Sequence, residues 1–132
     1  MQSDNAEIVK HGYDAWNRGD MAAVLELVDP QFEWQEASEV PGGGAVYTRE
    51  EFESYLRSLE RHWDDFRLEP QELRQAGDHV LVEVLELARG RTSGAEVAQR
   101  FVHVWTLRGR RACRMRAYLE KGEAMEALGL LT

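Results

Sequence analysis

The sequence is poor in cysteine and in long apolar runs. Cys113 is the single cysteine in 132 residues, which excludes an internal disulfide framework and a zinc site built from several cysteines. No apolar run approaches the roughly 20 residues that a membrane-spanning helix needs, and the N-terminal segment lacks the apolar core of a signal peptide. We therefore expect a cytoplasmic protein that does not enter a membrane.

Positive charge is also scarce, with 16 Lys and Arg against 24 Asp and Glu and a net charge of −8. Nucleic-acid binding needs a basic surface that contacts phosphates, so we do not expect it here. Five arginines nevertheless lie between residues 108 and 116. They could form an anion or RNA patch, but aromatic residues do not alternate with them as base platforms would require. The pattern favours a basic hairpin turn and the solvent face of a strand.

Motifs for metals and phosphates are missing as well. The four histidines are scattered without the spacing of a metal site. The three glycines Gly42 to Gly44 lack the Lys-Ser/Thr of a phosphate-binding loop, so we interpret the segment from Glu36 to Tyr47 as a plain loop. The sequence thus predicts neither a metal nor a cofactor.

The first half of the chain has helical periodicity. Its composition, 43% hydrophobic and 30% charged, is typical of one globular domain over residues 1–132. Apolar residues recur at helical spacing in an N-terminal segment that ends at Asn17-Arg18-Gly19-Asp20, and a short helix is expected from Met21 to Val28. Thr48 to Glu51 forms a capping box in front of an apolar stripe that runs from Phe52 to Trp63, which predicts a third helix.

From Phe66 onward the apolar period changes to two, which is typical of strands. We expect strands over residues 66–74, 79–91, 97–107 and 112–120, a short earlier strand over 32–35, and a closing helix over 122–128. Pro70 lacks a backbone N–H and so places the first of the long strands at a sheet edge. Helices followed by a strand meander predict an α+β fold with helices packed on one face of an antiparallel sheet.

Several segments resemble one known family along nearly the whole chain. The beginning and the end of the chain, with one internal strand, are similar to the SnoaL-like polyketide cyclase branch of the nuclear transport factor 2-like superfamily. The segments that carry the resemblance are Tyr13 to Asp20, Leu27, Asp29-Pro30, Phe32, Val104 to Leu107, Tyr118 to Lys121 and Glu123 to Leu130.

The resemblance implies a cone, in which a curved antiparallel or mixed sheet wraps the N-terminal helices around an apolar pocket. It implies a small apolar or aromatic ligand, and a homodimer formed through the outer face of the sheet, where Val102, Val104, Thr106, Arg114, Arg116 and Tyr118 are expected. Members include cofactor-free cyclases and isomerases as well as ligand-binding proteins without catalysis. A polyketide cyclase or isomerase, a ligand sensor or carrier, and a dimeric accessory module all remain open, because fold does not determine function.

Strand alternation indicates which side chains line the pocket. Phe101, His103 and Trp105 share one face of their strand, and Leu81, Glu83 and Leu85 share one face of the preceding strand. Comparison with ketosteroid isomerase suggests that both faces point inward. The same comparison places Gln35 where that enzyme has its base and Gly12, one residue before Tyr13, where it has its tyrosine. We therefore do not expect steroid isomerisation by that mechanism.

The leading hypothesis for catalysis is an acid–base pair of His103 and Glu83 inside the pocket, because an imidazole beside a carboxylate in a dry cavity can shuttle a proton near neutral pH. The alternative is a core histidine with an ordinary hydrogen bond. A register shift of one residue would turn each side chain to the other face. The expected pocket wall comprises Tyr13, Trp16, Trp34, Gln35, Trp63, Leu81, Leu85, Phe101, Trp105, Met115 and Leu119.

Overall fold

The computed structural model describes residues 3–38 and 44–129 of the chain. Its elements are α1 (Ser3–Asn17), α2 (Met21–Glu26), β1 (Val28–Gln35), β2 (Val46–Thr48), α3 (Arg49–His62), β3 (Trp63–Ala76), β4 (His79–Gly90), β5 (Glu96–Arg108), β6 (Arg111–Tyr118) and α4 (Lys121–Ala127). The α+β prediction is therefore confirmed. Residues 39–43 of the predicted loop lie outside the described residues.

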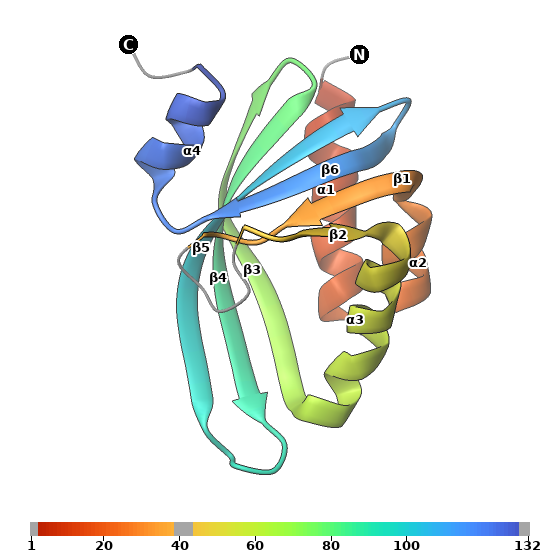
Figure 1. Cartoon of the computed structure of the whole chain (residues 1–132), viewed down its shortest axis with the longest axis vertical. Coiled ribbons are helices and arrows are strands. Elements are labelled where there is room, and N and C mark those ends of the chain that lie inside the picture. The colour runs from red at the N-terminus through yellow and green to blue at the C-terminus, as the bar shows by residue number, and fades with distance from the viewer. Residues whose placement is uncertain (1–2, 39–43, 130–132) are drawn as a thin grey trace.

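Six strands form one open, mixed sheet in the order β2-β1-β6-β5-β4-β3. Strands β1 and β6 run parallel, and the other neighbours are antiparallel. As Figure 1 shows, the sheet curves around α1, α2 and α3, while α4 lies on its other side. Strand β3 is an edge strand, as Pro70 predicts, and the ladder with β4 is irregular between Pro70 and Glu72.

Two elements near the predicted loop differ from expectation. Strand β1 begins at Val28, four residues before the predicted start, because Val28 already pairs with Ala112 of β6. Strand β2 occupies the end of the segment that the sequence analysis interpreted as a loop, and Tyr47 pairs there with Trp34 of β1. Three residues are too few to show a clear alternation of apolar and polar side chains, so periodicity could not find this strand.

The C-terminal end of α1 is attached to the edge strand by one side chain. Asn17 Nδ2 donates to the backbone oxygen of Leu68 at 2.8 Å, and the Leu68 backbone N–H donates to Asn17 Oδ1 at 2.9 Å. Both backbone groups of Leu68 are therefore satisfied by one residue from α1. Because Tyr13 and Trp16 lie within the last two turns of α1, this contact also sets the position of their rings.

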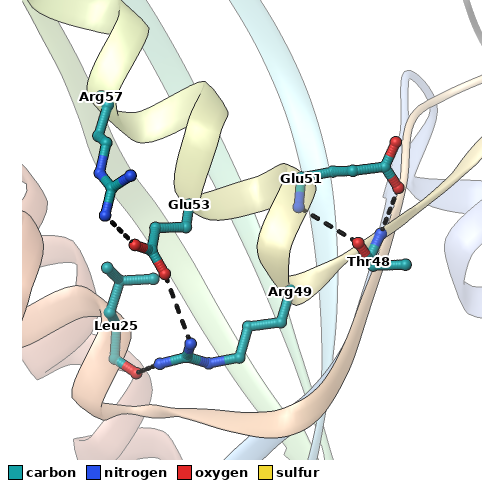
Figure 2. Close-up of polar contacts among 6 residues, drawn as sticks. All are labelled: Leu25, Thr48, Arg49, Glu51, Glu53 and Arg57. Atoms are coloured by element: carbon teal, nitrogen blue, oxygen red, sulfur yellow. Dashed lines mark hydrogen bonds and ion pairs between the residues drawn. The ribbon is translucent and has the colours of Figure 1, made fainter.

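Helix α3 begins at the predicted capping box. The Glu51 backbone N–H donates to Thr48 Oγ1 at 3.2 Å, and the Thr48 backbone N–H donates to Glu51 Oε1 at 2.9 Å (Figure 2). Arg49 donates to the Leu25 backbone oxygen next to the end of α2 at 3.2 Å and forms an ion pair with Glu53 at 3.6 Å. These contacts hold α3 against α2 on the concave side of the sheet.

The convex face of the sheet is partly covered by α4. Leu81, Val102 and Val104 are buried there against Ala124, with Met125 and Leu128 packed beside them. Val102 and Val104 thus lie on the outer face of the sheet, as expected, and α4 of the same chain covers them there. Both faces of β4 and β5 are thus apolar over part of their length.

Replacement of Thr48 by Ala should lower the free energy of unfolding by about 1 kcal/mol, the usual cost of losing an N-cap side chain. Urea unfolding followed by circular dichroism measures this difference. Thr92→Ala is the control, since Thr92 is exposed in the turn between β4 and β5. Equal stability of the two variants would show that the capping box does not support α3.

Candidate functional site

An apolar cavity of about 100 Å³ lies between the helices and the concave face of the sheet. Its wall is built from α1, α2, α3 and five of the strands, so every layer of the fold contributes to it. Of the predicted pocket residues, the structure places these at the wall: Tyr13, Trp16, Trp34, Phe101, His103, Trp105 and Met115.

The other predicted pocket residues lie elsewhere. Gln35 points away from the neighbouring Trp34 and donates to the Gly44 backbone oxygen at 3.2 Å. Trp63 ends α3 and packs edge-on against Phe66, with ring centroids 5.7 Å apart. Leu119 packs against the core beyond the end of β6 without reaching the cavity wall.

The predicted pairing of Glu83 with His103 is wrong. In the ladder between β4 and β5, Val82 lies opposite His103 and Glu83 lies opposite Val102. Glu83 therefore shares the convex face with Leu81 and Leu85, and its carboxylate forms an ion pair with Lys121 of α4 at 3.2 Å. The choice of face for the whole strand was reversed, since side chains alternate along it.

Tyr13, His103 and Trp105, called the Tyr13 cluster below, are joined by buried hydrogen bonds. Trp105 Nε1 donates to the Tyr13 hydroxyl oxygen at 2.8 Å, and that oxygen lies 2.9 Å from His103 Nδ1. The Tyr13 and His103 rings are stacked with an interplanar angle of 9°. Tyr13 and His103 are only 3% and 8% exposed, so the cluster connects α1 to β5 out of contact with solvent.

These hydrogen bonds determine the protonation of His103. Because an indole N–H only donates, the Tyr13 oxygen accepts from Trp105, and its own proton is available to His103 Nδ1. Nδ1 is then the acceptor and Nε2 carries the proton. Burial lowers the pKa of His103 to about 4, so the ring is neutral at pH 7. Within the part of the chain that the structure describes, Nε2 has no hydrogen-bond partner, and His103 lines the cavity. The cluster therefore offers one neutral N–H donor to a ligand.

Glu36 and Glu86, called the carboxyl pair below, also line this cavity. Glu36 directly follows β1, and Glu86 lies on the concave face of β4, four residues from Val82. Val82 is the residue opposite His103 in the ladder. At about 3.3 Å per residue, Glu86 is roughly 13 Å from Val82 along β4. Tyr55 of α3 lines the cavity as well. The polar groups of the cavity thus fall into two separate sets.

The two carboxyls and Tyr55 influence one another. Burial, with a smaller contribution from the charge of Glu36, raises the pKa of Glu86 to about 7. Burial also raises the pKa of Glu36, although the neighbouring Ala37 backbone N–H opposes the rise. The pKa of Tyr55 is raised by burial and by the charges of Glu86 and Glu36. At neutral pH Glu86 therefore exchanges a proton readily beside a second carboxyl, that of Glu36.

The sequence analysis missed Glu36, Tyr55 and Glu86 as site residues. Each face of β4 carries one glutamate among apolar residues, Glu83 on one face and Glu86 on the other, so composition could not distinguish the two. Glu86 lies on the same face of β4 as Val82 and Val84. If the valine face is known to point inward, alternation along the strand therefore identifies Glu86 as a cavity residue. Glu36 follows the last residue of its strand, where alternation no longer gives a direction.

The arrangement combines a neutral hydrogen-bond donor with a carboxyl that titrates near neutrality inside an apolar cavity. Such a site can hold a carbonyl oxygen and move a proton on the same ligand.

Within residues 3–38 and 44–129, no group of three or more histidine, cysteine, aspartate or glutamate side chains is arranged to hold a metal ion. In the same residues, no helix is both long and apolar enough to span a membrane.

Comparison with known proteins identifies similar domains. A family model described as SnoaL-like domain matches residues 9–115, whereas no curated protein matches the chain. A nuclear transport factor 2-like protein of unknown function from Burkholderia pseudomallei is 24% identical, with 93% of this chain and 95% of that chain covered and a TM-score of 0.74. TerC, crystallised with polyporic acid, is 23% identical, with 96% and 98% covered and a TM-score of 0.74. A candidate polyketide cyclase from Pseudomonas putida is 17% identical, with 92% and 96% covered and a TM-score of 0.76. At these identities the solved structures show a shared fold.

Replacement of Tyr13 by Phe should lower the free energy of unfolding by on the order of 2 kcal/mol, because the Trp105 N–H and His103 Nδ1 would both lose their buried partner. Urea unfolding measures this loss, and nitrogen chemical shifts of the His103 ring report the change in its hydrogen bonding. Tyr118→Phe on the other side of the sheet is the control. A Tyr13→Phe protein with wild-type stability and an unchanged His103 spectrum would contradict the hydrogen-bonded cluster.

Proposed function

The chain belongs to the SnoaL-like domain family, and on this premise we propose that its cavity binds a small hydrophobic molecule and acts on it as a cofactor-free cyclase or isomerase. The observation that carries the proposal is the separation of polar groups in an apolar cavity, with the Tyr13 cluster in one place and the carboxyl pair in another. The polyporic acid in TerC and the candidate cyclase from Pseudomonas putida support a flat, carbonyl-bearing ligand of the polyketide type.

The proposed chemistry is proton transfer next to a carbonyl. The ligand carbonyl oxygen accepts a hydrogen bond from His103 Nε2–H, and the ionised Glu86 carboxylate takes a proton from a carbon conjugated with that carbonyl. The electron pair of the broken C–H bond forms an enolate, whose oxygen the His103 N–H stabilises. In a ring closure, this carbon attacks a second carbonyl carbon, and the oxygen of that carbonyl takes the proton from Glu86. In an isomerisation, a different carbon of the conjugated enolate takes the proton from Glu86.

Glu86 takes the role that the sequence analysis gave to Glu83. A general base works best when its pKa lies near the working pH, and burial together with Glu36 raises the pKa of Glu86 to about 7. Glu83 is half-exposed on the convex face and paired with Lys121. His103 keeps a role at the ligand as a neutral donor, because burial lowers its pKa.

The test uses 5-nitrobenzisoxazole, a flat neutral probe of general bases. A base removes its C3 proton, the C–H electron pair forms the nitrile, and the N–O bond breaks to release a coloured phenolate. We expect Glu86→Gln to lose roughly 100-fold in rate and the control Glu83→Gln to keep the wild-type rate. The wild-type rate should rise with pH through about 7 as Glu86 ionises. Glu36→Gln removes a neighbouring negative charge and should shift that midpoint to lower pH.

Two results would contradict this role. If the probe binds and Glu86→Gln turns it over as fast as the wild type, Glu86 is not the base. If the probe binds to the wild type without turnover above the rate in buffer, the chain is a ligand carrier or sensor. Binding without turnover is followed by the quenching of tryptophan fluorescence, since Trp16, Trp34 and Trp105 line the cavity.

We also propose a homodimer, formed through the part of the convex sheet face that α4 leaves free. Helix α4 covers Val102 and Val104, so the free part includes the exposed Arg114 and Arg116 of β6. Sedimentation equilibrium at micromolar concentration should give twice the mass of the chain. A mass equal to one chain over this range would contradict the dimer.

A further inference from the structure

The carboxyl pair faces a cavity that offers no positive charge. Of the described residues that line the cavity, none is a lysine or an arginine, and the one histidine, His103, is kept neutral by burial. Within residues 3–38 and 44–129, neither Glu36 nor Glu86 forms an ion pair. Two acids of the same sign therefore share one apolar space, where neither carboxylate has a cationic partner among the described residues.

This lack of a partner contrasts with the acidic side chains on the outside. Glu83 pairs with Lys121 at 3.2 Å, Glu33 with Arg114 at 3.8 Å, and Glu53 with Arg49 at 3.6 Å. These three glutamates outside the cavity each have a cationic partner, whereas neither glutamate of the carboxyl pair has one among the described residues. Because a buried charge is costly unless it is paired, the missing partner at the carboxyl pair is one that a ligand can supply.

Aromatic rings surround the same part of the cavity. Trp34, which follows Glu33 and precedes Glu36 by two residues, packs against Tyr55 with ring centroids 4.8 Å apart. Both rings line the cavity, and the pKa of Tyr55 responds to the charges of Glu86 and Glu36. Faces of tryptophan and tyrosine rings attract cations, so the rings and the carboxylates favour the same kind of ligand group.

Unpartnered donors elsewhere in the cavity indicate a ligand independently of the acids. His103 and Trp16 are each 8% exposed and line the cavity. His103 Nε2 has no partner among the described residues, and Trp16 Nε1 is buried without one in the same part of the chain. Buried N–H groups cost free energy when they are left unpaired, so a ligand that supplies an acceptor oxygen would satisfy them.

We propose that Glu36 and Glu86 bind a positively charged nitrogen, so that the ligand of this cavity is a hydrophobic amine that also carries an acceptor oxygen. This inference rests on the proposed function, because it names the class of molecule that the same cavity takes. Glu36 holds the ammonium group beside the rings of Trp34 and Tyr55, and the oxygen lies toward His103. Glu86 remains the group that exchanges a proton with the ligand.

The experiment compares two probes of nearly equal shape, 1-naphthylmethylamine and 1-naphthylmethanol, which differ in a single charged group. Binding is measured at pH 8 by titration calorimetry and by tryptophan fluorescence. We expect the wild type to bind the amine about tenfold more tightly than the alcohol, a difference typical of one charge pair assisted by an aromatic face. Glu36→Gln and Glu86→Gln should each reduce affinity for the amine and leave affinity for the alcohol unchanged.

Glu83→Gln is the matched control, because it removes the same charge from the other face of β4 and should keep the preference for the amine. Circular dichroism checks that each variant is folded, and either of the two cavity variants suffices if the other fails to fold. Two results would overturn the inference and leave the proposed apolar ligand site intact. One is equal affinity of the wild type for both probes, and the other is a preference for the amine that survives in both cavity variants. If neither probe binds, the inference and the ligand-binding part of the proposed function both fail.

Discussion

The buried hydrogen bonds among Tyr13, His103 and Trp105 are the contact on which the rest of the cavity depends. They connect the C-terminal half of α1 to the central part of β5, so they set how closely the helix approaches the sheet. They also determine the tautomer of His103 and leave its second nitrogen to the cavity. Tyr13 and His103 are buried and Trp105 is partly buried, so the loss of the Tyr13 hydroxyl would leave two polar groups without their partner. The same contact therefore supports the packing of α1 on the sheet and orients the His103 ring at the cavity wall.

The cavity depends equally on the distance between this cluster and the carboxyl pair. The curvature of the sheet lets the segment after β1 and the concave face of β4 approach the same apolar space, where Glu36 and Glu86 influence each other. Helix α3, held by its capping box and by Arg49, brings Tyr55 to the same place. Under the proposed function, the carboxyls and the histidine would contact different parts of one ligand, because they lie in separate parts of the cavity.

Much of the fold could be predicted from local patterns. The capping box at Thr48, the edge position indicated by Pro70 and the change of period near Phe66 are properties of neighbouring residues, and the structure contains the elements that they predict. The site was harder. Tyr13, Trp16 and His103 line the cavity, but the partner expected for His103 was on the wrong face. Helix α4 buries part of the convex face of β4, so both faces of this strand carry apolar side chains around one glutamate. Hydrophobicity therefore could not indicate which face is inside.

The sequence by itself determined the succession of helices and strands apart from β2, the family, and the aromatic character of the cavity, because these depend on residue type and on spacing along the chain. Only the tertiary structure decided which glutamate of β4 faces the cavity. That choice depends on the register of β4 against β5, with Val82 opposite His103, and on a closing helix that covers the other face. Both are contacts between residues far apart in the chain, and a shift of one residue in the register would exchange Glu83 and Glu86.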